Sequence, residues 1–142
     1  YLTGSYNNIE VLSQLQNLKK LILVGMFNGL TSKGIPPIDF LSSMKSLEKL
    51  DISSNEYIFY IRPVTVLPHL KSLDIAGCVN IRDLVTIGDL KSLKKLDIRG
   101  ITGPGELPKE EQEAIASLPQ LKTLIASKPF DIQTNIKHFK IK

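Results

Sequence analysis

The chain has 142 residues and a mass of 15.8 kDa, the size of one domain or of a piece of a longer protein. Hydrophobic residues make up 42% and charged residues 23%, which excludes a disordered tail, a collagen and a mucin-like stalk. Aromatic residues make up only 6%, which argues against a surface that stacks sugar rings or nucleic-acid bases. No apolar run approaches the roughly 20 residues that cross a bilayer, so we expect a soluble protein without a membrane partner.

The charge and the single cysteine indicate which partners and which cellular location to expect. The formal net charge is +4, from 15 Lys, 3 Arg and 14 acidic residues that are interspersed along the chain. Nucleic-acid surfaces more often concentrate Arg and Lys on one face, so we do not expect a nucleic-acid partner. Cys78 has no partner for an internal disulfide, and no Asn-x-Ser/Thr sequon is present. Both absences favour an intracellular location, in the cytoplasm or the nucleus.

A repeated segment dominates the sequence. Five segments share the spacing of Leu67-Pro-His-Leu70-Lys-Ser-Leu73-Asp-Ile75, and they begin 29, 23, 23 and 28 residues apart. They cover residues 15–23, 44–52, 67–75, 90–98 and 118–126. A three-residue apolar rhythm that is broken once by a two-residue step predicts a coil around a central core, with one short strand per turn. Each turn leaves one apolar side for its neighbour to cover, so stacking creates the core.

The repeat resembles a known family. The pattern L-x-x-L-x-L/I-x-x-N/C, with Asn55 and Cys78 in the last position, is similar to the leucine-rich repeat and covers residues from about 1 to about 129. The resemblance implies an α/β fold, a right-handed horseshoe solenoid with a parallel sheet on the concave face and short helices or extended arcs on the convex face. It also implies that the Asn55 and Cys78 side chains hydrogen-bond to backbone inside their turns. Met26, Ile101 and Pro129 depart from the pattern, so their turns must satisfy the backbone in another way.

We predict a single domain over residues 1–142 with about five repeats. Strands are expected near residues 19–24, 48–53, 71–76, 94–99 and 122–126. A helical turn is expected near 39–44, and Pro108 followed by acidic residues predicts a helix over 109–117. Residues 136–141 resemble the strand consensus but begin only 15 residues after Leu121, too few for a full turn. Since the chain opens in the middle of a repeat, we expect it to be an excerpt of a longer solenoid.

Parallel strands place equivalent residues in columns about 4.8 Å apart. The first column holds Lys20, Lys49, Ser72, Lys95 and Thr123, the second Ile22, Asp51, Asp74, Asp97 and Ile125, and the third Val24, Ser53, Ala76, Arg99 and Ser127. The stacked carboxylates repel one another, and we expect Lys49, Lys95 and Arg99 to offset much of that repulsion. The candidate partner-binding residues of this concave face are Lys20, Lys49, Asp51, Asp74, Lys95, Asp97 and Arg99. They would select a partner that carries Lys or Arg, unless aspartate is only the family's consensus residue here.

Two further surface features stand out. Tyr57, Phe59 and Tyr60 align with polar residues of the next turn, so they are a second candidate partner-binding site, an exposed aromatic patch. The alternative is that the residues after Phe27 fold over these rings. An outer lysine column, Lys19, Lys71, Lys94 and Lys122, is interrupted by Glu48, and we interpret it as a solvated edge.

No constellation of residues predicts catalysis, a metal site or a cofactor. His69 and His138 lie in different turns without metal-ligand spacing, and Cys78 occupies a buried repeat position. The glycines around Pro104 resemble a phosphate loop but lack its Lys-Ser/Thr. We therefore expect a protein that is not an enzyme and takes no small-molecule substrate.

The expected function is protein-protein interaction, with a protein or peptide partner on the concave face. The phrase L-K-S-L-D-I-A-G-C resembles the cysteine-containing repeats of ubiquitin-ligase substrate receptors and also the repeats of plant immune receptors, while the turns of 21 to 23 residues resemble the phosphatase-regulator type. Two alternatives stay open: a substrate-recruiting receptor of a ubiquitin ligase complex, and a purely structural spacer in a larger protein.

Overall fold

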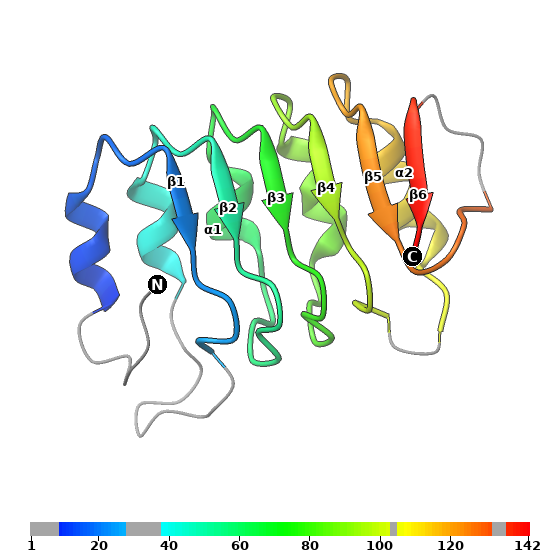
Figure 1. Cartoon of the computed structure of the whole chain (residues 1–142), viewed down its shortest axis with the longest axis horizontal. Helices are drawn as coiled ribbons and strands as arrows, with labels where there is room; N and C mark the ends of the chain where they lie inside the picture. The colour runs from blue at the N-terminus through cyan, green and yellow to red at the C-terminus, as the bar shows by residue number, and fades with distance from the viewer. Residues whose placement is uncertain (1–8, 28–37, 103–104, 132–135) are drawn as a thin grey trace.

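The computed structural model describes residues 9–27, 38–102, 105–131 and 136–142. Its centre is one open sheet of six parallel strands, which follow one another in the sheet in chain order (Figure 1). The strands are β1 (Lys20–Ile22), β2 (Lys49–Asp51), β3 (Ser72–Asp74), β4 (Lys95–Asp97), β5 (Thr123–Ala126) and β6 (His138–Ile141). Each strand therefore returns to its neighbour by a crossover, which is the arrangement of a leucine-rich-repeat-like solenoid.

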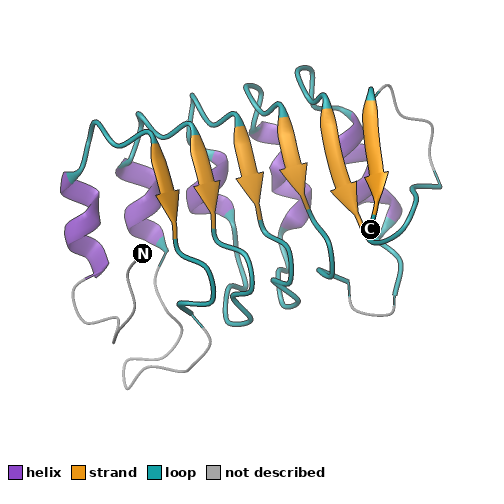
Figure 2. Ribbon diagram, in the orientation of Figure 1, coloured by secondary structure: helices purple, strands orange, loops and turns teal. Residues whose placement is uncertain are grey.

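Short helices lie on one side of the sheet, behind the strands in Figure 2, one of them before β1 and the others in crossovers between strands. They are the 3₁₀ helices η1 (Ile9–Gln14), η2 (Asp39–Ser43) and η3 (Leu84–Asp89) and the α-helices α1 (Arg62–Thr65) and α2 (Lys109–Ala116). The crossover from β4 to β5 is long enough for the eight-residue α2, whose first turn carries Glu110 and Glu111. The helical turn predicted near 39–44 and the helix predicted over 109–117 are both present.

A ladder of one residue per strand forms the centre of the core. Leu21, Leu50, Leu73, Leu96, Leu124 and Phe139 are paired across the sheet in register. The five leucines are buried, with exposed fractions between 0% and 7%. Burial of one such side chain contributes roughly 1.5–3 kcal/mol, so every turn adds to the stability of the stack.

The sixth strand is absent from the five-strand prediction. β6 pairs in parallel with β5, from Thr123 opposite His138 to Ala126 opposite Ile141. Phe139 takes the ladder position, and its ring meets Phe130 edge-on with the ring centroids 5.2 Å apart. A crossover shorter than a full repeat is therefore long enough to return the chain to the sheet, which the length argument did not anticipate.

The turns after the strands are held by buried polar side chains. Asn55 Nδ2 donates to the carbonyls of Leu23 and Ile52, at 2.8 and 2.7 Å, and its Oδ1 accepts from Phe27 N at 2.6 Å. One turn later, Cys78 Sγ donates to the Ile52 carbonyl at 3.1 Å. Asn55 makes the expected hydrogen bond to backbone inside its own turn, whereas the bond of Cys78 goes to the preceding turn. Both side chains join one turn to the preceding one.

The backbone after Pro129, where the consensus Asn or Cys is missing, is held by a different residue. Gln112, on α2 and only 3% exposed, donates from Nε2 to the Leu107 carbonyl and accepts at Oε1 from Asp131 N, both at 2.8 Å. A glutamine on a helix thus holds the segment before α2 and the backbone after Pro129. Sequence reasoning missed Gln112 because it lies outside the repeated segment.

Candidate functional site: the open face of the sheet

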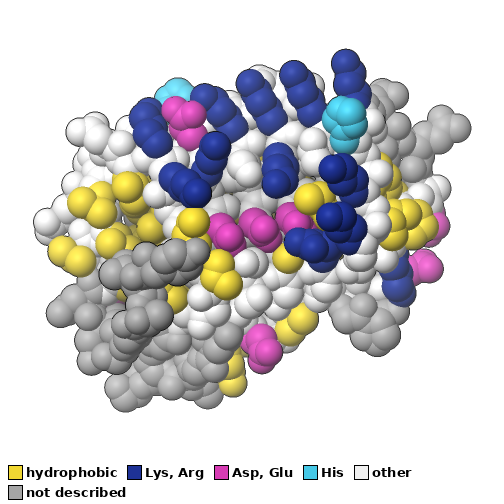
Figure 3. Space-filling view, in the orientation of Figure 1, with side chains coloured by type: hydrophobic (Ala, Val, Ile, Leu, Met, Phe, Trp, Pro, Cys, Tyr) yellow, Lys and Arg dark blue, Asp and Glu magenta, His cyan; other side chains and the backbone are white. Residues whose placement is uncertain are grey.

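The open face of the sheet is the side that none of the described helices covers, and it carries the first two predicted columns. The register pairs Lys20 with Lys49, Lys49 with Ser72, Ser72 with Lys95, and Lys95 with Thr123. Asp51, Asp74 and Asp97 are paired in the same way. In Figure 3 dark blue Lys and Arg side chains gather along the upper part of this face, with a magenta row of acidic side chains below them.

A hollow of about 480 Å³ lies on this face over β1 to β4. Most of its lining residues have polar or charged side chains, and they include both columns, from Lys20 at one end to Lys95 and Asp97 at the other. In the first column the short side chain of Ser72 lies between the long side chains of Lys49 and Lys95. The hollow is therefore deepest at Ser72.

The aspartates of the second column bind their own turns. The Oδ1 atoms of Asp51, Asp74 and Asp97 accept hydrogen bonds from the backbone N–H two residues later, at 3.0, 3.0 and 3.2 Å. Each carboxylate therefore caps the chain where it leaves its strand. This repeated contact explains why aspartate recurs at the position, and it supports the interpretation of aspartate as a consensus residue.

Asp97 is not a surface residue. Its side chain is only 4% exposed because Arg99 covers it: Arg99 Nε and Nη2 donate to the two carboxylate oxygens at 2.9 and 2.8 Å. These hydrogen bonds to Asp97 raise the pKa of the Arg99 guanidinium above its usual value. At this position the face presents the outer side of Arg99, which is 42% exposed, and not a carboxylate.

Asp74 lies between the other two aspartates. Burial raises the pKa of its carboxyl above the ordinary value, and the neighbouring Asp97 and Asp51 raise it further, although the Ala76 N–H and Arg99 act in the opposite direction. The ionised form of Asp74 is therefore less stable in the fold than in water. The expected help from Lys49 and Lys95 is not seen, because no ion pair joins either lysine to an aspartate in the described part of the chain. Both lysines are exposed and extend into solvent.

The outer lysine column is divided by Glu48. This carboxylate pairs with Lys71 at 2.6 Å and with Lys19 at 3.4 Å. The hydrogen bonds from Lys71 and Lys19 hold the pKa of Glu48 below its usual value. Lys94 and Lys122, further along the column, have no such partner among the described residues.

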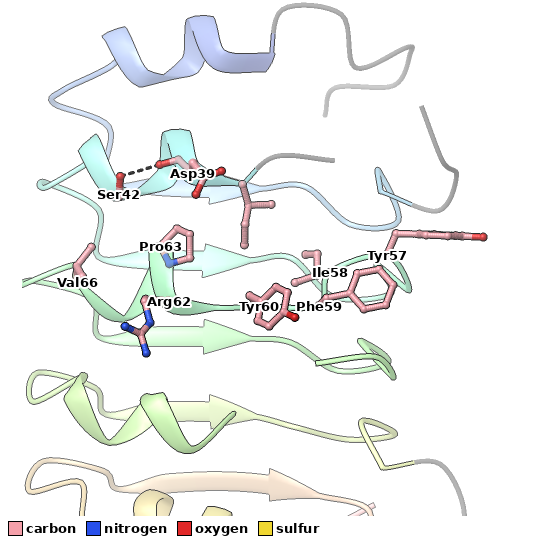
Figure 4. Close-up of a pocket in the computed structure, with 10 residues that line it drawn as sticks. Asp39, Ser42, Tyr57, Ile58, Phe59, Tyr60, Arg62, Pro63 and Val66 are labelled. Atoms are coloured by element: carbon pink, nitrogen blue, oxygen red, sulfur yellow. Dashed lines mark hydrogen bonds between the residues drawn. The ribbon is translucent and has the colours of Figure 1, made fainter. Parts of the chain in front are cut away.

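The aromatic patch lies away from the open face, at a groove between η2 and α1 (Figure 4). Tyr57 and Phe59 are half-buried with their ring centroids 6.5 Å apart, and Tyr60 is 55% exposed. Arg82 lies over the Phe59 ring, 4.9 Å from its centroid. The groove measures about 520 Å³. The alternative in which the residues after Phe27 cover the rings concerns residues 28–37, which lie outside the described residues.

Three further features concern the described residues: metal sites, membrane-spanning helices and the reactivity of the thiol. They contain no group of three His, Cys, Asp or Glu side chains placed to hold a metal ion. No helix among these residues is both long enough and apolar enough to cross a membrane. Burial raises the pKa of the Cys78 thiol to about 11, so this thiol stays protonated at neutral pH.

Comparisons with known proteins add little to the assignment of the fold. No family model and no curated protein matches the chain. Among solved structures, the chain is similar to the plant peptide hormone receptor RGFR1 in complex with RGF2, at 16% identity and a TM-score of 0.43 over 82% of this chain. The chain spans 22% of the length of that receptor chain. The description as a leucine-rich-repeat-like solenoid therefore rests on the repeated segment and on the six-stranded parallel sheet.

Proposed function

We propose that the chain is a non-enzymatic, intracellular recognition module that binds a protein or peptide partner through the open face of its sheet. The hollow of about 480 Å³ on that face is the observation that carries the proposal. Parallel sheets are normally covered on both faces, whereas the helices that the structure describes cover only one (Figure 2). A polar face left open on a parallel sheet is a surface that a partner can occupy.

The sheet also suits recognition because it is already formed. Its strands are fixed by backbone hydrogen bonds to neighbours in a single register, so the side chains of the columns project from a rigid support. Binding to a preformed surface costs less conformational entropy than ordering a loop, and modest contacts can then suffice. The horseshoe curvature expected from the family is part of this proposal, since a concave face would contact more of its partner.

A neutral steric block tests the proposal. The substitution Ser72→Trp fills the centre of the hollow without changing the charge of the face. We expect affinity purification and mass spectrometry of the protein that contains this chain to show at least tenfold less of its partners with this variant. Val85→Trp is the matched control, because Val85 is 50% exposed on η3, on the helical side. Circular dichroism and urea unfolding check that both variants fold.

The outcomes separate the alternatives. Recovery of the same proteins in the same amounts with Ser72→Trp would contradict the proposal and favour a structural spacer. Loss of a cullin complex among the partners would favour the ubiquitin-ligase receptor within the proposed function.

A further inference from the structure

The acidic groups of the open face are already engaged. Glu48 is shared by Lys19 and Lys71, Asp97 is enclosed by Arg99, and Asp51 accepts from both the backbone N and the Oγ of Ser53. Asp74 is half-buried and caps its own turn. A cationic partner would therefore find few free carboxylates, contrary to the expectation of a partner that carries Lys or Arg.

Three lysines of the open face and of the outer column at its edge have no such partners in the described part of the chain. Lys94, Lys95 and Lys122, here called the lysine cluster, are exposed and make no ion pair among the described residues. Lys95 is the first residue of β4, and Lys94 precedes it. The backbone N of Lys122 donates to the Lys94 carbonyl at 2.9 Å, so the two residues lie on adjacent turns, about 4.8 Å apart across the sheet.

Like charges at this spacing repel one another, and no carboxylate among the described residues forms an ion pair with these lysines. The neighbours of Lys95 in the first column are Ser72 and Thr123, and the neighbour of Lys94 on the other side is Lys71. Such an arrangement costs stability by itself, and an anionic ligand would reverse the sign of the interaction. A cost of this kind is typical of a binding surface.

We propose that the lysine cluster binds an acidic segment of the partner, a run of Glu or Asp side chains that crosses β4 and β5. This inference rests on the proposed function and names the chemistry of the partner. A peptide fits better than a nucleic acid, because the aromatic rings of Tyr57, Phe59 and Tyr60, on which bases could stack, lie at the other groove.

Peptide binding tests the chemistry directly. The probe is a fluorescein-labelled peptide of six glutamates, measured by fluorescence anisotropy with the 142-residue chain at low and at physiological salt. The cluster variant is Lys94→Gln, Lys95→Gln and Lys122→Gln. Its matched control is Lys45→Gln, Lys91→Gln and Lys109→Gln, which removes the same charge from lysines in the helical crossovers and adjoining turns. We expect binding that weakens at higher salt, a loss of at least tenfold with the cluster variant and a change below twofold with the control.

Three results would overturn the inference: an equal loss with both variants, tighter binding of a six-lysine peptide than of the glutamate peptide, or tighter binding of a six-residue oligothymidine. Repeating the affinity purification with the cluster variant separates this inference from the proposed function. If Ser72→Trp removes the partners and the cluster variant retains them, the face binds but acid recognition is wrong. If Ser72→Trp retains them, the proposed function itself fails.

Discussion

Single side chains, more than strand length, join the turns of this solenoid. The strands contain only three or four residues each, so backbone pairing alone gives each turn few hydrogen bonds. Asn55 adds contacts that cross from one turn to the next, with Leu23 and Phe27 on one side and Ile52 on the other. A fully buried amide that satisfies backbone groups of two turns is therefore a structural residue, and it stands outside the candidate binding surfaces.

Asn55→Ala is expected to lower the free energy of unfolding by about 3 kcal/mol, because it leaves buried backbone groups without partners. Urea unfolding followed by circular dichroism measures the change. Asn80→Ala is the control one turn later, where an exposed amide donates a single bond to the Glu56 carbonyl, and it should cost less than about 1 kcal/mol. Equal losses in the two variants would show that the buried network of Asn55 adds nothing special.

At the scale of the strands, the aspartate column combines a stabilising contact with an unfavourable charge. The hydrogen bond to the N–H two residues later fixes the end of each strand, but an amide oxygen could accept the same bond. The negative charge is costly at Asp74, which is flanked by Asp51 and Asp97. At Asp74, replacing the carboxylate by an amide of the same shape therefore separates the effect of the hydrogen bond from the effect of the charge.

Asp74→Asn is expected to raise the urea midpoint at pH 7 and to leave it unchanged near pH 3. The pKa of Asp74 is higher in the folded chain than in the unfolded one, chiefly through burial, so folding favours the protonated carboxyl. Stability from this group is complete below the unfolded pKa and is lost as the pH rises through the folded pKa. Asp89→Asn, at an exposed position of η3, controls for the change in net charge. A lower midpoint for Asp74→Asn at pH 7 would mean that the ionised carboxylate stabilises the fold.

At the scale of the whole molecule, the sequence predicts what repeats and misses what does not. The spacing of the leucines predicts the parallel sheet and the alignment of Lys49, Ser72 and Lys95, because every turn obeys the same register. It does not predict that Arg99 covers Asp97, since that contact depends on one arginine in one turn. Gln112 and the strand β6 are missed because both lie outside the five repeated segments.

Stability in such a stack should depend on how many neighbours a turn has. Leu73 and Phe139 occupy the same position of the core ladder, but Leu73 has a strand on either side and is 1% exposed, whereas Phe139 lies on the edge strand β6 and is half-buried. We expect Leu73→Ala to lower the free energy of unfolding of the 142-residue chain by about 3 kcal/mol or more, because it leaves a cavity between two packed turns. Phe139→Ala removes a larger side chain, yet it should cost only about 1–2 kcal/mol, because its site is open to water and can relax. Urea unfolding of both variants gives the comparison, and hydrogen exchange of the β3 and β6 amides shows whether the edge strand opens first. A greater loss for Phe139→Ala would mean that the end of the stack, and not its centre, limits the stability of the chain.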